Sequence, residues 1–373
     1  MSFRFLILCF YLIIGSNSVG LAQDGQPWRK AVAPWDWQFP RDHGSHPEFQ
    51  TEWWYFTGNL QDEKGRPFGY QLTFFRQGVL KNPQQKSAWA LRDIYFAHFA
   101  VSDIQDNQFH FFERNSRGAL GLADYSQAGM DIRLEDWKLT QTGEDSFNFA
   151  AQGAGVELKL NLKMAKPKVF HGNKGLSQKS AEVGNASYYY SYTRMESEGI
   201  LKLKERKFRV QGKSWFDHEI SSSFLAHNHV GWDWFSIQLD SGEDIMLYKL
   251  RLREGGSDPY SHGSLIEIDG TKKDLKLDDY KIKVTKHWKS GKSQGIYPAG
   301  WRVEIPSEQI NLTITPAMAD QELRLKGLGA INYWEGSCVI EGVRKGQPVR
   351  GRGYVELTGY AGELGTQGRS LRE

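Results

Sequence analysis

The chain has few cysteines, little excess charge and no apolar run long enough to stay in a membrane. Only two of its 373 residues are cysteines, Cys9 and Cys338. The 47 basic and 44 acidic residues leave a formal net charge of +3, so the composition gives no basis for binding nucleic acid. A single cysteine outside the N-terminal apolar run cannot form an internal disulfide. The sequence therefore predicts a globular protein without disulfides.

Motifs for metal or cofactor binding are incomplete. His218-Glu219-Ile220-Ser221-Ser222 begins like a zinc-protease helix, but Ser222 stands where the second histidine is needed. His227 and His229 could bind a metal from one strand face, yet no third ligand is evident. Neither a phosphate loop nor a dinucleotide fingerprint is present. We expect no cofactor and no metal.

The N-terminus is typical of a cleaved export signal. Arg4 precedes a continuous apolar run from Phe5 to Ile14, and Gly20-Leu21-Ala22 supplies small residues at a cleavage site. The run is too short for a stable transmembrane anchor. We interpret residues 1–22 as a signal peptide and expect a periplasmic or secreted protein. Export without disulfides favours a bacterial periplasm.

Alternating apolar and polar residues dominate the chain after residue 50. Val156 to Met164 alternates strictly, and Asp62-Glu63-Lys64-Gly65 and Asp240-Ser241-Gly242 are typical turns. Similar strands are expected at Ile94–Val101, Phe208–Trp215, Met246–Leu252, Tyr280–Val284 and Ile310–Thr315. No long segment has a convincing helical period. The fold class is all-β and antiparallel.

A two-fold internal repeat divides the chain. Trp53-Trp54-Tyr55-Phe56 matches Trp232-Asp233-Trp234-Phe235, and the strand from Val210 to Asp217 matches the strand from Val349 to Glu356. Each copy has enough strands for a small barrel able to hold one apolar ligand. The pattern predicts two tandem barrels packed against each other, residues 23–224 and 225–364, with a leader to about residue 40 and a tail at 365–373.

Several motifs together resemble the carotenoid 1,2-hydratase-like family, which includes AttH-type proteins regarded as secreted hydrolases. They cover residues 39–361 and include Phe39-Pro40-Arg41-Asp42-His43-Gly44, Glu52-Trp53-Trp54-Tyr55, Trp215-Phe216-Asp217-His218-Glu219 and Tyr354-Val355-Glu356. The resemblance implies tandem lipocalin-like barrels. It also implies a large apolar substrate, because relatives hydrate isoprenoid double bonds or cyclise polyketides.

Asp217 is the best candidate for a catalytic acid. An unbroken strand puts Trp215, Asp217 and Glu219 on one face and turns His218 to the other. Hydration of an alkene needs a strong proton donor in a water-excluding pocket, and apolar walls raise the pKa of a carboxyl group there. We predict catalytic residues among Asp217, His218 and Glu219, with a general base among His98, Glu52 and Asp233. The same carboxylates could instead hydrolyse an ester or glycoside.

Aromatic residues near these acids form the predicted substrate-binding set. They are Trp53, Trp54, Tyr55, Trp215, Trp232 and Trp234, whose ring faces could stabilise a carbocation. Alternatively, these rings fill barrel cores, His98 is a core histidine, and Glu52 forms an ion pair with Arg41. The expected partner is a small lipophilic molecule, and contact with an exporter stays open. A carrier without catalysis is the second hypothesis, and a scaffold with filled barrels is the third.

The export signal gives the first prediction. Protein recovered from the periplasm should begin at Gln23, because cleavage is expected after Ala22. Intact-mass measurement tests this, and a mass that still includes residues 1–22 would contradict it.

Overall fold

The computed structural model describes residues 27–81, 91–223, 225–326 and 332–362. The predicted signal peptide and tail lie outside these residues. The described residues form strands and short 3-10 helices and contain no α-helix. None of their helices is long and apolar enough to cross a membrane. The all-β prediction is therefore confirmed.

The N-terminal half forms a thirteen-stranded antiparallel sheet in the order β4-β3-β2-β1-β13-β12-β9-β8-β7-β6-β5, with β10 and β11 paired to β12. The strands are β1 (Thr51–Asp62), β2 (Pro67–Gly78), β3 (Asp93–Asp103), β4 (Gln108–Ser116), β5 (Ala123–Tyr125), β6 (Asp131–Leu134), β7 (Trp137–Gly143), β8 (Ser146–Gly153), β9 (Val156–Met164), β10 (Val169–Phe170), β11 (Leu176–Gln178), β12 (Ala186–Leu203) and β13 (Arg206–Ser221). Two 3-10 helices, η1 (Arg41–His43) and η2 (Ala119–Gly121), accompany them.

The C-terminal half forms a ten-stranded sheet in the order β17-β16-β15-β14-β25-β24-β22-β21-β18, with β23 on β24, and a separate pair β19-β20. The strands are β14 (His229–Leu239), β15 (Asp244–Leu252), β16 (His262–Ile266), β17 (Lys272–Lys276), β18 (Lys281–Val284), β19 (His287–Lys289), β20 (Ile296–Pro298), β21 (Trp301–Ile305), β22 (Ile310–Pro316), β23 (Glu322–Leu323), β24 (Asn332–Arg344) and β25 (Gln347–Ala361). The 3-10 helices are η3 (Leu277–Asp279) and η4 (Pro306–Glu308).

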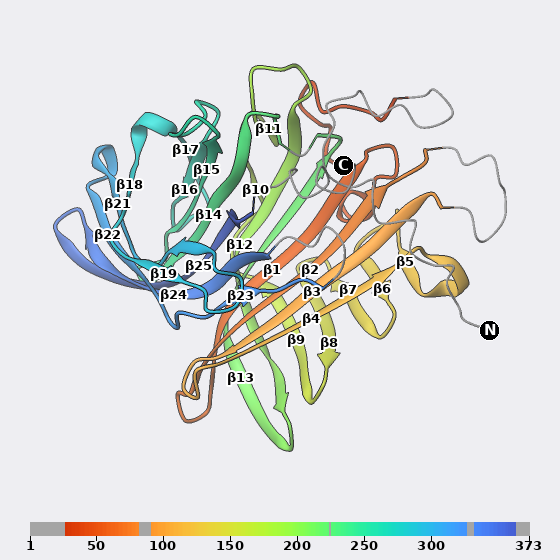
Figure 1. The fold of residues 1–373 in the computed structure, drawn as a ribbon, viewed down its shortest axis with the longest axis horizontal. Coiled ribbons are helices and arrows are strands. Elements are labelled where there is room, and N and C mark those ends of the chain that lie inside the picture. Colours follow the sequence, from red (N-terminus) through yellow and green to blue (C-terminus); the bar gives the residue numbers. More distant parts are fainter. Residues whose placement is uncertain (1–26, 82–90, 224, 327–331, 363–373) are drawn as a thin grey trace.

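The two sheets curl to different extents. In the first, β6 approaches β3 and β4 across the sheet, so the sheet is a nearly closed barrel. The second is a half-barrel, and the two lie side by side (Figure 1). The prediction of two barrels is therefore right in number, but the second is more open than expected. The predicted boundary near residue 224 falls in the connection between β13 and β14.

Both halves have the same strand order, which supports the internal repeat. In the first half β1 pairs with β2 on one side and with the last strand, β13, on the other. In the second half β14 pairs in the same way with β15 and the last strand, β25. The register agrees too, because Tyr55 faces Asp217 as Trp234 faces Glu356. The repeat therefore extends from sequence to residue pairing.

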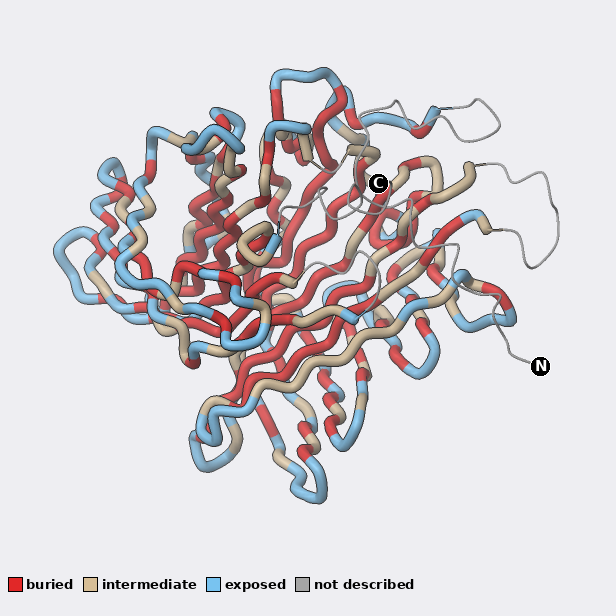
Figure 2. Tube along the Cα trace, in the orientation of Figure 1, coloured by how far each residue is buried: buried red, intermediate tan, exposed pale blue. Residues whose placement is uncertain are grey.

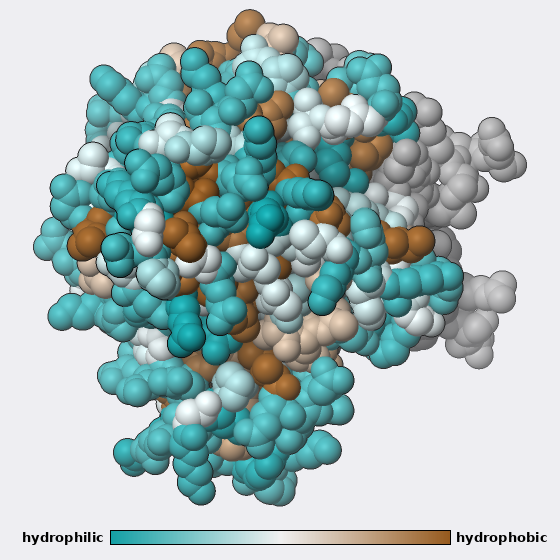
Figure 3. Space-filling model, turned by 90° about the vertical axis from the view of Figure 1, so that its left-hand side faces the viewer, coloured by the Kyte–Doolittle hydropathy of each residue, from teal (hydrophilic) through white to brown (hydrophobic). Residues whose placement is uncertain are grey.

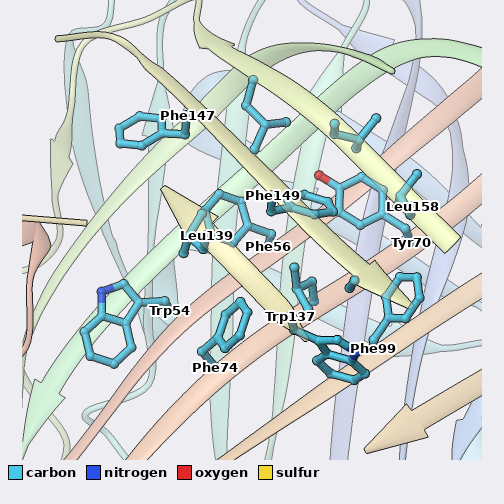
Figure 4. Packing of buried hydrophobic residues seen from close by; sticks show 14 of the residues in the cluster. Trp54, Phe56, Tyr70, Phe74, Phe99, Trp137, Leu139, Phe147, Phe149 and Leu158 are labelled. Atoms are coloured by element: carbon cyan, nitrogen blue, oxygen red, sulfur yellow. The ribbon is translucent and has the colours of Figure 1, made fainter. Parts of the chain in front are cut away.

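Side chains fill the concave face of each sheet. The first core contains Trp54, Phe56, Tyr70, Phe149 and Phe216 (Figure 4), and the second contains Phe235, Trp301, Trp334 and Cys338. Buried residues recur along nearly all long strands (Figure 2). The surface turned to the viewer in Figure 3 is mainly hydrophilic with scattered hydrophobic residues. Among the described residues, neither barrel interior is an open apolar cup of the kind a carrier needs.

The halves pack through the outer faces of their central strands. A third cluster joins Tyr55, Tyr189 and Trp215 of the first half to Trp234 and Tyr354 of the second, together with other residues of both halves. A buried ion pair between Arg194 on β12 and Asp244 on β15, at 2.6 Å, also crosses this interface. We call this contact between the two outer faces the interface.

The filled cores predict matched losses of stability. Phe56 and Phe235 occupy equivalent positions of the repeat and have no exposed surface. Replacing either by alanine should lower the free energy of unfolding by about 3–5 kcal/mol. Because the interface is packed and buried, we expect one unfolding transition that both substitutions shift. Calorimetry showing two transitions, each moved by only one substitution, would contradict this coupling.

Candidate active site

One row of side chains crosses each sheet and faces the interface. In the first sheet the paired positions run His98, Thr73, Tyr55, Asp217 and Ser191. In the second sheet, the equivalent positions are His262, Tyr248, Trp234, Glu356 and Glu335. Adjacent members of a row lie on the same face, because each is directly opposite its neighbour on the next strand. The interface thus gathers carboxyl, hydroxyl and aromatic groups from both copies.

Asp217 is buried at the centre of this arrangement. Its carboxylate accepts hydrogen bonds from Tyr189 Oη at 2.7 Å, from Trp215 Nε1 at 2.6 Å and from Ser191 Oγ. In the described part of the chain its partners are therefore hydroxyl and indole groups rather than Arg or Lys. Burial raises the pKa of Asp217 to about 7, although its hydrogen bonds act in the opposite direction. Asp217 can consequently hold a transferable proton near neutral pH.

Two further acids come from the second half. Glu335 and Glu356 are directly opposite each other on β24 and β25. Burial raises the pKa of Glu356 to about 7 and that of Glu335 well above its usual range, and each is raised further by neighbouring carboxylates. Trp232 Nε1 donates to Glu356 at 3.0 Å, whereas neither Glu335 oxygen has a well-formed hydrogen bond to a described residue. Opposed acids cannot both ionise at low cost, so the pair retains protons.

Glu219 is held differently from the other interface acids. It accepts a hydrogen bond from Ser187 Oγ and pairs with Lys179 Nζ at 3.3 Å. Lys179 also lies over the Tyr248 ring at 4.3 Å, and nearby Glu219 raises the lysine pKa against the effect of burial. Glu219 therefore has a cationic partner, and Asp217 does not. This difference supports separate roles for the two acids.

Aromatic rings surround the interface acids. Tyr55, Trp215 and Trp234 are buried in the interface cluster, and half-buried Trp53 and Trp232 pack against it. Trp234 lies edge-on to both Tyr55 and Trp215, at centroid distances of 5.2 and 6.0 Å. Five of the six predicted substrate-binding aromatics are therefore together. Trp54 is not, because it occupies the opposite face of β1 and fills the first core.

Of the predicted bases, only His98 faces the interface. Its Nδ1 lies 2.7 Å from the Tyr333 hydroxyl of the second half. Burial lowers the His98 pKa to about 3, so the imidazole is neutral at physiological pH and can accept a proton only from a strong acid. His98 is thus buried, as the alternative predicted, and β2 and β1 lie between it and Asp217.

Glu52 and His218 lie on the other side of the first sheet, away from Asp217. Glu52 Oε1 is 3.0 Å from His218 Nε2, and the His218 ring stacks on Trp54. The predicted Glu52–Arg41 ion pair is wrong. Glu52 pairs with Arg76 at 3.2 Å and Arg41 pairs with Asp42 at 2.6 Å. The pairing follows strand register, because Arg76 is directly opposite Glu52 on β2.

Asp233 is also separate from the interface acids. It alternates with Trp232 and Trp234, so it faces the second concave surface. There it pairs with Arg251 Nε at 3.0 Å and accepts a hydrogen bond from Tyr360 Oη at 2.9 Å. Of the two histidines considered as metal ligands, His229 bonds Asp258 at 2.9 Å. The structure therefore gives Asp233 and His229 local partners of their own.

The sequence interpretation omitted Glu335, Glu356, Tyr189 and Tyr333 from the site. The repeat already contained a signal for Glu356, because it aligns with Asp217. Glu335, Tyr189 and Tyr333 have no such signal, since their place depends on which strands pair. A Gly-x-Ser-x-Gly spacing, as found in hydrolases, occurs from Gly291 to Gly295. It lies in the turn between β19 and β20 and precedes no helix, so it does not form a nucleophile elbow.

An open groove of about 870 Å³ lies near the interface. Its walls come from both halves and include Trp35, Trp37, Phe170 and Lys272. Phe170 and Gly172 line the groove. His171 lies between them in the chain, and its Nε2 atom is 2.7 Å from Ser191 Oγ. Ser191 in turn donates to Asp217. Few residues therefore separate Asp217 from an open surface.

The comparisons with known proteins agree with this architecture. A family model described as AttH-like matches residues 30–360. The chain belongs to the AttH-like family. An AttH structure from Nitrosomonas europaea is 31% identical, with a TM-score of 0.80, covering 89% of this chain and 99% of that one. A comparison with curated proteins finds no match.

Kievitone hydratase from Nectria haematococca shares the fold of this AttH-like chain at much lower identity. Its structure is 13% identical, with a TM-score of 0.67, covering 94% of this chain and 96% of that one. At this identity the likeness establishes the fold alone. It confirms the lipocalin-like architecture that the sequence predicted.

The raised pKa of Asp217 predicts a pH dependence of stability. Between its ordinary value of 3.8 and about 7, the folded protein holds a proton that the unfolded chain releases. The free energy of unfolding should therefore fall as pH rises through this window. Asp217→Asn should remove part of that fall, on the order of a few kcal/mol.

The difference in pH dependence is measured by urea unfolding of both proteins between about pH 4.5 and 8, which covers most of that window. The raised pKa values of Glu356, about 7, and of His46, about 9, make both groups contribute within this pH range. Both remain in the variant, so the difference between the two curves reports Asp217. Parallel pH curves for the two proteins would mean that Asp217 is already ionised in the folded state.

Proposed function

We propose that this AttH-like protein is an exported hydratase-like enzyme that adds water to a carbon–carbon double bond of a lipophilic substrate, with Asp217 as the acid. The observation that carries the proposal is the burial of Asp217 between the two sheets, where its described partners are hydroxyl and indole groups and not a cation. Such a carboxyl group can donate a proton at neutral pH because desolvation disfavours its charged form. The fold shared with a hydratase is consistent with this chemistry.

The first step is proton transfer from Asp217 to one alkene carbon. It breaks the π bond, forms a C–H bond and leaves a carbocation together with the Asp217 carboxylate. Trp215 Nε1 donates to the acid, and Trp234 packs edge-on against Trp215. The ring faces of this cluster can stabilise the cation. Tyr189, Trp215 and Ser191 already donate hydrogen bonds to Asp217, so they stabilise the carboxylate as it forms.

The second step adds water to the cation and returns a proton to the enzyme. Glu219 is the proposed base, because it is paired with the ammonium group of Lys179 at 3.3 Å, a cationic partner that Asp217 lacks among the described residues. The net reaction consumes one alkene and one water and yields an alcohol. Proton exchange among the interface acids and solvent restores Asp217. Half-buried Trp53 and Trp232 pack against the cluster, and we assign them to the substrate entrance.

The structure gives less support to the carrier hypothesis. A lipocalin-type carrier holds its ligand in the barrel interior, but large side chains occupy both interiors in the described residues. The interface also contains acids that pure binding of an apolar ligand would not require, since burying them is costly. Both observations favour catalysis at the interface.

Asp217→Asn tests this function directly. The amide keeps the shape but has no proton acidic enough to transfer, so turnover should fall by roughly two to four orders of magnitude. A panel of isoprenoid alkenes is screened for products heavier by one water, and rates are compared at equal folded concentration. Binding of an apolar fluorescent probe should change little.

Asp233→Asn is the matched control. It removes another buried carboxylate, one that pairs with Arg251 in the second concave face. This variant should lose stability but keep its rate per folded molecule. An Asp217→Asn protein with normal turnover per folded molecule would show that Asp217 has only a structural role.

A further inference from the structure

The concave side of the first sheet holds a buried cluster that the proposed reaction does not use. His46, from the segment before β1, lies 2.8 Å from Glu52 Oε1 through its Nδ1 atom. His218 on β13 lies 3.0 Å from the same oxygen through Nε2. The three ligand atoms lie within 4.8 Å of one another, and the side chains are at most 1% exposed. The cluster is therefore compact and shielded from water.

We propose that His46, Glu52 and His218 form a structural binding site for a divalent transition-metal ion of the zinc class. Two imidazoles and one carboxylate are a known zinc ligand set, in which a water completes the tetrahedron. Tetrahedral bonds of about 2.0–2.2 Å place neighbouring ligand atoms on the order of 3.3 Å apart. The present separations of 2.8 and 3.0 Å need to widen by only a few tenths of an ångström.

The groups behind the three ligands are those that orient ligands in metal sites. His46 Nε2 lies 3.2 Å from Asp42 Oδ1, and His218 Nδ1 lies 3.1 Å from the Tyr190 hydroxyl. Each imidazole is thus fixed through its second nitrogen, as metal-binding histidines usually are. The second oxygen of Glu52 accepts a hydrogen bond from Arg76 Nε at 3.2 Å, which leaves Oε1 directed at the histidines.

The charges in this cluster also favour a divalent cation. Apart from the histidines, its buried charged members are the carboxylates of Asp42, Glu52 and Asp93 and the guanidinium of Arg76. Three negative groups and one positive group leave two negative charges. Arg41, which pairs with Asp42, is half exposed and is therefore screened by water. A divalent ion balances the buried charges and leaves both histidines neutral.

The second half repeats the strand pairing of the first but lacks the cluster. By the shared register, Gly231 occupies the position of Glu52, and Leu357 occupies the position of His218. The first half alone therefore carries the three ligands. Their effect would be local, because a metal bound there joins the His46 segment to β1 and β13.

The test uses the full mature chain and metal content as its readout, so it is independent of any substrate. The protein is stripped with a chelator and dialysed, then loaded with Zn²⁺ or Co²⁺. We expect one ion per chain, a higher melting temperature than the stripped protein, and a Co²⁺ visible spectrum typical of tetrahedral nitrogen and oxygen ligation. His218→Asn should lose stoichiometric binding. Tyr190→Phe should weaken affinity by roughly 10–100-fold, as loss of an orienting group does.

His229→Asn is the control, because His229 is a buried histidine paired with a single carboxylate outside the cluster. It should retain one ion per chain. If His218→Asn does not fold, the wild-type spectrum and the Tyr190→Phe affinity still decide whether the cluster binds the metal. Less than a tenth of an ion per chain after loading, with an unchanged melting temperature, would overturn the proposal, since ligand binding to the native state must raise stability. Loss of the ion in His229→Asn would also overturn it.

Discussion

The alternation of side chains along β13 separates two chemical environments within one strand. Trp215, Asp217 and Glu219 face the interface, whereas Phe216 and His218 face the first core. Both sides of the strand are buried, so every polar group on either side needs a partner. Asp217 finds hydroxyl and indole donors, and His218 finds a carboxylate and a phenol. A shift of one residue in the pairing of β1 with β13 would exchange the two sets and lose both.

Burial of the interface acids costs stability, and the surrounding structure offsets that cost. Asp217, Glu335 and Glu356 all have raised pKa values because water is excluded. Remaining protonated avoids most of the penalty of a buried charge. The aromatic residues that exclude water also contribute apolar burial to the contact between the halves. The same rings therefore stabilise the interface and keep the acids protonated.

Much of the fold follows from the sequence, since alternation and turns are local signals. Val156–Met164 and Ile310–Thr315 form strands close to the predicted bounds, and the repeat predicts the two large sheets. Asp217 and Glu219 were placed on the right face for the same local reason. Glu335 could not be found, because its place in the interface depends on packing between the sheets. Tyr189 could not be found, because its approach to Asp217 depends on the pairing of β12 with β13. The partner of Glu52 was missed, since it is decided by the register of β1 against β2.

The two halves keep one scaffold but differ in the polar groups they bury. Asp217 and Glu356 occupy equivalent positions, yet Ser191 faces the first and Glu335 the second. At these positions the first sheet thus provides one acid with three donors, whereas the second provides a pair of opposed acids. On the concave faces, Arg76 and Arg251 are also equivalent, but their carboxylate partners differ. Glu52 lies directly opposite Arg76, while Asp233 lies two residues beyond the corresponding Gly231.

Moving a carboxylate by two residues keeps it on the same face, because side chains alternate with a period of two. The arginine therefore retains a partner in each half, while the position directly opposite it is free to change. In the second half Gly231 occupies that position, so the proposed metal ligand that Glu52 supplies in the first half is missing. The repeat thus preserves the charge pairing that folding needs and confines the His46, Glu52 and His218 cluster to one half.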